Sequence, residues 1–282
     1  KNAAAYGMAL GQAPGYILDQ FSMDHWIEDG KDYFRVATSK QQQWMWLEDD
    51  VTGVETWQPS EEESDNLVTI FELPTSDGED MKQIAQLSGL GKPGEQIYSV
   101  RFLGKRGFIV TFEQTDPFYT LDLSVPEDPR VVGELEIPGF SSYLHPYGEN
   151  IIVGVGQNVD PDTLARTGLQ ISMFDVSDFK NPERIKHYVE GGSDSSSSES
   201  EYNHQAFRLL EDSGLLILPV SKYRYRYGDA SGSFDGFVVY SLETESIQTI
   251  STFRTLLIRP LSLAGAGVRP TCNRAQLWSM AI

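Results

Sequence analysis

Four polar residues are candidates for chemistry because of where they fall in the sequence. Asp24, Arg101 and His145 each lie in a segment that precedes a turn and an apolar strand, and His204 lies at a similar point. If these segments are the inner strands of sheets arranged around a central channel, the four side chains would point to the channel, where ligands often bind. His145 and His204 could then serve as metal ligands or acid–base groups. The alternative, which we favour, is that they hydrogen-bond neighbouring repeats.

A second set of candidates consists of carboxylates that can offer oxygen ligands to calcium. Asp160 and Asp162 lie in the stretch NVDPDT, and Asp116 or Glu113 could join them. The stretch does not match the spacing of an EF-hand loop, and the histidines show no metal-binding spacing. We therefore favour a loop with Asp caps. We predict no cofactor, and calcium is the one ion considered for this set.

Catalytic motifs do not accompany these residues. The sequence contains no G-x-S-x-G elbow, no G-x-G-x-x-G fingerprint and no Walker loop. We therefore assign no catalytic residue and favour a non-enzymatic protein over an enzyme.

The elements that must position the candidates form a repeat. Four predicted strands share a pattern in which a polar residue and an aliphatic residue end the strand. They are VTIFEL (68–73), FYTLDL (118–123), QISMFDV (170–176) and GFVVYSL (236–242). A polar turn and another strand follow each one, and a hairpin completes the unit. The aliphatic residues are spaced by 50, 53 and 66 positions. Four strands per roughly 40 to 50 residues are typical of a β-propeller blade.

The repeat predicts an all-β fold, a β-propeller with four-stranded antiparallel blades. About four blades are recognisable over residues 1–253, and we expect an incomplete circle. A β-sandwich is the alternative, but it would not repeat the same strand order at this period. Two segments are predicted to be loops, the Trp-rich acidic stretch 44–64 and the Ser-rich insert 191–201. Residues 254–282 contain four Arg and no acidic residue, and we expect a divergent, disordered tail.

The composition of the chain limits the classes of partner that it can bind. Lys and Arg number 22 against 41 Asp and Glu, which gives a net charge of −19. Such a surface repels nucleic acid and suits cations or basic partners.

A single cysteine, Cys272, excludes an intrachain disulfide and a thiolate metal site. No apolar run reaches the roughly 18 residues of a membrane helix. The chain begins at Lys1, so we expect a processed chain or a fragment whose signal peptide is not visible.

At several of these stretches the chain resembles a known family, the secreted β-propeller domain proteins of archaea and bacteria, which are distantly related to WD-type repeats. The stretches are GYILDQFSMD (15–24), YFRVATS (33–39), GEQIYSVRFLGKRGFIVTF (94–112), DPFYTLDLSVPEDPRVVGELEIPGFSSYLHP (116–146) and ISMFDVSDFKNPERIKHYV (171–189). The resemblance covers about residues 11–253, and it is to the C-terminal portion of a longer propeller.

The resemblance implies an extracellular or cell-surface location and carries over no catalytic activity. We expect a binding or scaffolding module for a protein, a glycan or a cation, with the missing blades supplied by a longer chain or a partner. The alternative function is a hydrolase or lyase with a polar or metal site in the channel. Neither nucleic-acid binding nor membrane insertion is expected.

Overall fold

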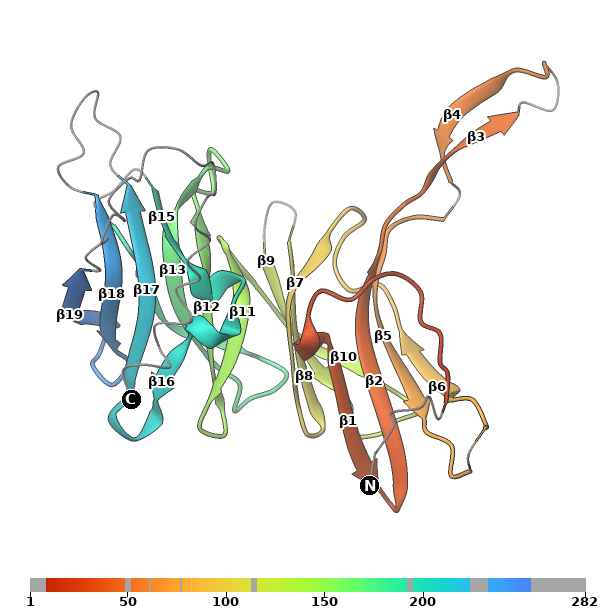
Figure 1. Ribbon diagram of the computed structural model, residues 1–282, viewed down its shortest axis with the longest axis horizontal. Coiled ribbons are helices and arrows are strands. Elements are labelled where there is room, and N and C mark those ends of the chain that lie inside the picture. The colour runs from red at the N-terminus through yellow and green to blue at the C-terminus, as the bar shows by residue number, and fades with distance from the viewer. Residues whose placement is uncertain are drawn as a thin grey trace, which may run out of the picture. The chain divides into compact units, whose positions relative to one another are not determined.

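The computed structural model describes residues 9–48, 52–60, 62–76, 78–112, 116–191, 195–223 and 233–254 (Figure 1). It divides into two compact units, and each is described by itself. Unit 1 comprises Lys1–Phe140 and Asp175–Glu183, and unit 2 comprises Ser141–Phe174 and Arg184–Ile282. Helices within the described residues are 3₁₀ turns of three residues each. No described helix has the length and apolar character needed to cross a membrane.

Unit 1 contains two four-stranded antiparallel sheets and a separate hairpin. The first sheet has the order β1 (Met23–Glu28), β2 (Lys31–Lys40), β5 (Asp65–Glu72) and β6 (Lys82–Leu87). The second has the order β7 (Gln96–Leu103), β8 (Arg106–Phe112), β9 (Asp116–Asp122) and β10 (Arg130–Ile137). The hairpin consists of β3 (Trp44–Glu48) and β4 (Glu55–Pro59), inserted between β2 and β5. A short turn, η1 (Gln20–Ser22), precedes β1.

Unit 2 holds most of a third sheet and all of a fourth. The third sheet has the order β11 (Phe140–Tyr147), β12 (Ile151–Val159), β13 (Arg166–Asp175) and β14 (Glu183–Val189). The fourth has the order β15 (Ser195–Ser198), β17 (Leu215–Tyr223), β18 (Phe234–Ser241) and β19 (Gln248–Arg254), with β16 (Arg208–Leu210) also paired to β17. Along the chain, the turns η2 (Glu199–Glu201) and η3 (His204–Ala206) connect β15 to β16, and η4 (Glu211–Ser213) connects β16 to β17.

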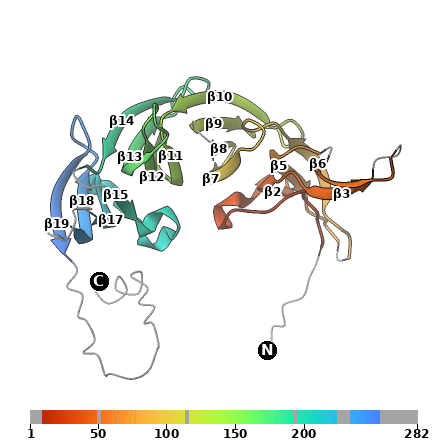
Figure 2. The ribbon, with the colours of Figure 1, turned by 90° about the horizontal axis from the view of Figure 1, so that it is seen from above.

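The burial of each strand follows its place in a sheet. The middle strands β5 and β8 are buried along almost their whole length, so both of their faces are covered. The outer strand β10 includes several exposed residues, because one of its faces meets solvent. Figure 2 shows β10 and β7 at opposite edges of their sheet. In unit 1, one apolar cluster contains residues of both sheets, including Val68 and Ile70 of β5 and Ile109 and Leu121 of the second sheet.

The predicted repeat matches the structure strand by strand. The four similar stretches correspond to the third strand of each sheet, namely β5, β9, β13 and β18. In two of these stretches, the acidic residue near the end closes the turn that follows. The carboxylate of Asp122 accepts a hydrogen bond from the Ser124 N–H at 2.9 Å, and Asp175 accepts from Ser177 at 2.8 Å. Hydrogen bonds from the hydroxyl and the N–H of Ser124, and from the N–H and the hydroxyl of Ser177, hold the pKa of the two carboxyls below the usual range.

The loop predictions for two segments were wrong. Within the Ser-rich insert, residues 195–198 form β15 and pair with β17, and η2 follows directly. Ser196, Ser198 and Ser200 are buried, and the Ser198 hydroxyl donates to the Pro219 carbonyl at 2.6 Å. Short hydroxyl side chains can satisfy buried backbone groups, so a serine run is able to form an inner strand. The stretch 44–64 contains a regular hairpin, β3–β4. The expected tail lies outside the described residues beyond Arg254, the last residue of β19.

Candidate functional site

Asp24 is held in an ion pair inside unit 1. The Arg35 side chain is fully buried, with Nη2 2.5 Å and Nε 3.0 Å from a carboxylate oxygen of Asp24. Nη2 also donates to the Gly104 carbonyl at 2.6 Å, which joins the first sheet to the turn between β7 and β8. The guanidinium lies 4.6 Å from the ring centroids of both Trp26 and Phe102. This geometry ties together the two sheets of unit 1 and supports the structural alternative for Asp24.

The other three channel candidates also have local partners. The Arg101 guanidinium lies 3.7 Å from the ring centroid of Phe21 in η1, within unit 1. In unit 2, the ring of His145 accepts or donates a hydrogen bond with the Tyr143 hydroxyl at 3.1 Å and lies 4.6 Å from the Phe207 ring. The carbonyl of His204 accepts from the Phe207 N–H, so Phe207 connects the two histidine segments. A shared channel site of these residues stays a prediction.

Asp160 and Asp162, two of the predicted calcium ligands, lie in a capped turn. Asp160 accepts hydrogen bonds at 2.8–3.0 Å from the N–H groups of Asp162 and Thr163 and from the Thr163 hydroxyl. These bonds hold the pKa of Asp160 below its usual range. Asp116 begins β9 opposite Ile137. Across the described ranges, no group of three His, Cys, Asp or Glu residues is placed to hold a metal ion.

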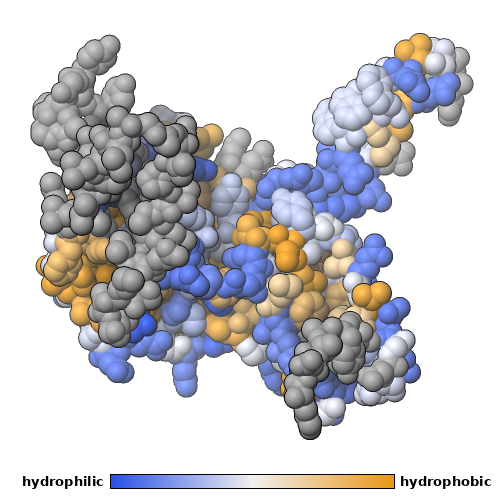
Figure 3. Space-filling model, viewed as in Figure 1, coloured by the Kyte–Doolittle hydropathy of each residue, from blue (hydrophilic) through white to orange (hydrophobic). Residues whose placement is uncertain are grey.

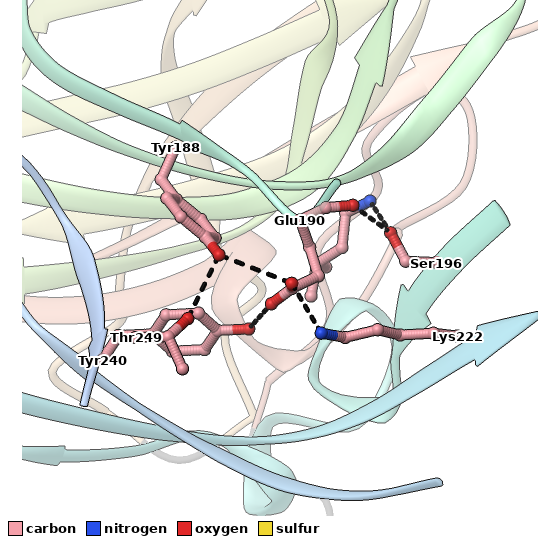
Figure 4. Close-up of polar contacts among 7 residues, drawn as sticks. Tyr188, Glu190, Ser196, Lys222, Tyr240 and Thr249 are labelled. Atoms are coloured by element: carbon pink, nitrogen blue, oxygen red, sulfur yellow. Dashed lines mark hydrogen bonds and ion pairs between the residues drawn. The ribbon is translucent and has the colours of Figure 1, made fainter. Parts of the chain in front are cut away.

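A buried polar cluster in unit 2 was missed by the sequence analysis (Figure 4). Glu190 is 4% exposed and follows β14. One of its carboxylate oxygens lies 2.6 Å from the Lys222 ammonium, and the other accepts from the Tyr240 hydroxyl at 2.7 Å. The Tyr188 hydroxyl lies 3.4 Å from the first oxygen and 3.1 Å from the Thr249 hydroxyl. The carboxylate thus has a cation and two phenols around it.

The polar contacts of the Glu190 cluster hold neighbouring strands together. Burial, and then the Glu190 charge, raise the pKa of Tyr240, so its phenol stays a hydrogen-bond donor at neutral pH. The Glu190 carbonyl accepts from the Ser196 hydroxyl at 3.1 Å, and this hydroxyl accepts from the Leu169 N–H at 2.8 Å. A side chain at Gly168 would lie 2.7 Å from the Ser196 hydroxyl, and the φ of Gly168 is +137°. The contacts connect the third sheet to β15, β17 and β18.

The β3–β4 hairpin, which we call the arm, is the most exposed element of unit 1 (Figures 1 and 3). All ten of its strand residues are exposed. Residues directly opposite on antiparallel strands share one face of the ribbon. The pairs Trp44–Pro59, Trp46–Trp57 and Glu48–Glu55 therefore form one face, which we call the aromatic face.

Cross-strand contact between indoles supports the arm. The Trp46 and Trp57 rings lie with centroids 5.4 Å apart at 57°, a tilted arrangement that aromatic pairs favour. Even so, Trp46 is 63% exposed and Trp57 is 52% exposed. An isolated two-stranded hairpin gains little from folding, so three open tryptophans are unusual on it unless they contact a ligand.

The foot of the arm carries two pockets. One has a cavity volume of about 470 Å³ and is lined by Met45 and Leu47 of the opposite face together with Lys40 and Glu62. Another of about 360 Å³ shares Lys40 and is bordered by Gln96 at the start of β7. The Lys40 ammonium lies 2.6 Å from the Glu62 carboxylate, and this pairing lowers the pKa of Glu62.

Local sequence patterns held a signal for the arm but no local signal for the Glu190 cluster. Three of the five tryptophans of the chain fall within 44–64, and Trp44 and Trp46 alternate as strand residues of one face do. Glu190, in contrast, precedes two glycines, and this local pattern is typical of an exposed acidic residue in a turn. Its burial depends on Lys222 and Tyr240, which lie 32 and 50 residues away.

Comparisons with known proteins agree with this geometry. A family model described as a beta propeller domain matches residues 1–256. An uncharacterized protein of Archaeoglobus fulgidus is 35% identical over 223 residues, which cover 79% of this chain and 29% of the relative. An uncharacterized protein of Methanocaldococcus jannaschii is 34% identical over 187 residues, which cover 66% of this chain and 25% of the relative. The chain thus spans less than a third of the length of these relatives. The predicted β-propeller fold is confirmed.

Proposed function

Because this chain belongs to the beta propeller domain family, we propose that it is a non-enzymatic binding module whose recognition element is the arm. The observation that carries the proposal is the aromatic face, where three tryptophans are each more than half exposed. Exposed aromatic clusters are characteristic of surfaces that contact a protein or a glycan. The sheets of unit 1 supply a rigid base, since β2 and β5 hold the two ends of the arm.

The Asp24–Arg35 pair supports a scaffold role for the body of unit 1. Nε and Nη2 of Arg35 donate to the Asp24 carboxylate, Nη2 also donates to the Gly104 carbonyl, and the guanidinium contacts two aromatic rings. Such a pair stabilises the packing of two sheets, and its guanidinium is fully buried. The arm, in contrast, presents its side chains to solvent.

We propose an extracellular or cell-surface location for the module, and a longer natural chain that supplies further blades. The acidic composition and the resemblance of the sequence to secreted propeller proteins support the first proposal. The short share of each relative that this chain covers supports the second.

The experiment compares the chain with its W46A/W57A variant on arrays of immobilised oligosaccharides and synthetic peptides. The matched control is Q58A, which changes the opposite face of β4. We expect at least one probe class to bind the chain and the control but to lose binding to the W46A/W57A variant. If no probe distinguishes the variant from the control, the arm is not a recognition element.

A further inference from the structure

The aromatic face combines two kinds of group that rarely share an exposed ribbon. The cross-strand pairs run from Trp44–Pro59 at the foot, through Trp46–Trp57, to Glu48–Glu55 near the tip. Indole faces carry negative potential, and the carboxylates next to them are negative as well. The whole face therefore favours a positively charged group.

The Glu48–Glu55 pair is a like-charge pair in a directly opposite register. Such a pair destabilises a hairpin when no cation offsets it. Among the ion pairs of the described residues, neither carboxylate has a Lys or Arg partner. The stretch 44–64 contains seven acidic residues and no Lys or Arg, so its neighbours in sequence do not offer one. A cation from outside the arm would relieve the repulsion.

The interior of unit 1 shows how this chain accommodates an arginine. Arg35 lies over the rings of Trp26 and Phe102 while its guanidinium binds the Asp24 carboxylate. The arm presents the same components, aromatic rings and carboxylates, without the arginine. A guanidinium suits this set better than an ammonium, because its flat face stacks on indole while its edge binds carboxylate in bidentate geometry.

We propose that the aromatic face of the arm binds an arginine-bearing segment of a partner protein. The inference rests on the proposed binding function and names the chemistry of its ligand. The guanidinium stacks on Trp46 or Trp57, and its N–H groups donate to Glu48 and Glu55. The net charge of −19 attracts such a segment over a longer range. A membrane surface is disfavoured, because anionic headgroups meet the same negative charge.

The test is isothermal titration calorimetry of the full chain with a peptide of repeating Arg-Gly-Ser units. The matched peptide carries citrulline, an uncharged analogue of arginine, at every arginine position. We expect the citrulline peptide to bind at least about tenfold more weakly. The W46A/W57A and E48Q/E55Q variants should each lose about tenfold in affinity for the arginine peptide.

A charge-matched variant separates local recognition from the overall field. E127Q/E136Q removes two negative charges from exposed positions of unit 1 outside the arm, and its affinity should stay within about twofold of the original. Equal losses in E48Q/E55Q and E127Q/E136Q would overturn the proposal, as would equal binding of the two peptides. Circular dichroism of each variant reports whether the sheets remain folded.

Other occupants give distinct outcomes. If a neutral oligosaccharide binds through the tryptophans and the arginine peptide does not, the inference fails while the proposed function stands. If no probe depends on the arm, both fail. If sedimentation shows self-association that W46A/W57A abolishes, the occupant is a second copy of the chain and the inference is wrong. Crosslinks from position 46 to residues 255–282 would identify the occupant as the chain itself and would also overturn it.

Discussion

Units 1 and 2 fill equivalent core positions with opposite chemistry. Leu90 follows the outer strand of the first sheet, and Glu190 follows the outer strand of the third. The Leu90 N–H donates to the Asn66 carbonyl at 3.4 Å, and the Glu190 N–H donates to the Leu169 carbonyl at 2.8 Å. Asn66 and Leu169 both lie six residues before the acidic residue that ends the third strand. Leu90 is therefore the counterpart of Glu190.

Leu121 and Tyr240 are a second equivalent pair. Each is the last but one residue of a third strand, and each lies opposite the second residue of the preceding strand, Gly107 or Leu216. Both side chains are fully buried. Unit 1 thus places two leucines in one apolar cluster, whereas unit 2 places a carboxylate and the phenol that donates to it.

The comparison shows that the same blade backbone can hold an apolar core or a polar core, and that the two cores have different requirements. The apolar version requires only packing. The polar version requires that every oxygen of Glu190 has a donor and that a cation balances its charge, because an uncompensated buried charge costs several kcal/mol. Lys222 and Tyr240 meet those conditions in unit 2.

The largest effect on stability should come from placing a glutamate in the apolar core of unit 1. L90E would bury a carboxylate in the apolar cluster of unit 1, and it should lower the free energy of unfolding by about 4 kcal/mol at neutral pH. The loss should shrink at acidic pH, because protonation removes the buried charge. Urea denaturation at several pH values measures it. V131E, at an exposed position of β10, is the control, and equal costs for both variants would contradict the comparison.

Removing the cation from the polar core should rank next. K222M leaves the Glu190 carboxylate buried without its charge partner and should cost about 3 kcal/mol in the free energy of unfolding. Lys92 pairs with Glu136 at 3.7 Å with both side chains well exposed, so K92M should cost less than about 1 kcal/mol. Thermal and urea unfolding of both variants decide the point. A K222M cost no greater than that of K92M would mean that the Lys222 pair is dispensable.

The phenol should contribute less than the cation. Y240F deletes the hydroxyl that donates to Glu190 at 2.7 Å, and we expect a loss of about 2 kcal/mol in the free energy of unfolding. Y188F deletes a hydroxyl that lies farther from Glu190, at 3.4 Å, and that also contacts the Thr249 hydroxyl at 3.1 Å, and its cost should be about 1 kcal/mol or less. Each variant removes one phenolic oxygen, and urea denaturation of the two compares the hydroxyl at 2.7 Å from Glu190 with the hydroxyl at 3.4 Å. The reverse order would contradict the assignment of Tyr240 as the main donor.

Local sequence pattern was sufficient to predict the blades but not their contents. The third strands were predictable because a polar residue and an aliphatic residue end each stretch before a turn, and Asp122 and Asp175 cap two of these turns. The arm was expected as a loop, because acidic residues and a glycine concealed the alternation of Trp44 and Trp46. The Glu190 cluster depends on contacts between residues far apart in sequence. Aligning Glu190 with Leu90 is the signal that could have revealed it, since an acid at a core position of a repeat needs a partner.

The smallest effect should come from converting the polar core to the apolar kind in one step. E190L/K222M/Y240F removes the buried charge, its cation and its donor together, so no group is left unsatisfied. Replacing a whole buried ion network by apolar residues of similar volume is often neutral or stabilising. We expect the free energy of unfolding to change by about 1 kcal/mol or less, against a much larger loss if the single effects were added. Urea denaturation tests this, because a full additive loss would show that the backbone of unit 2 itself depends on the Glu190 cluster and that the two cores are not interchangeable.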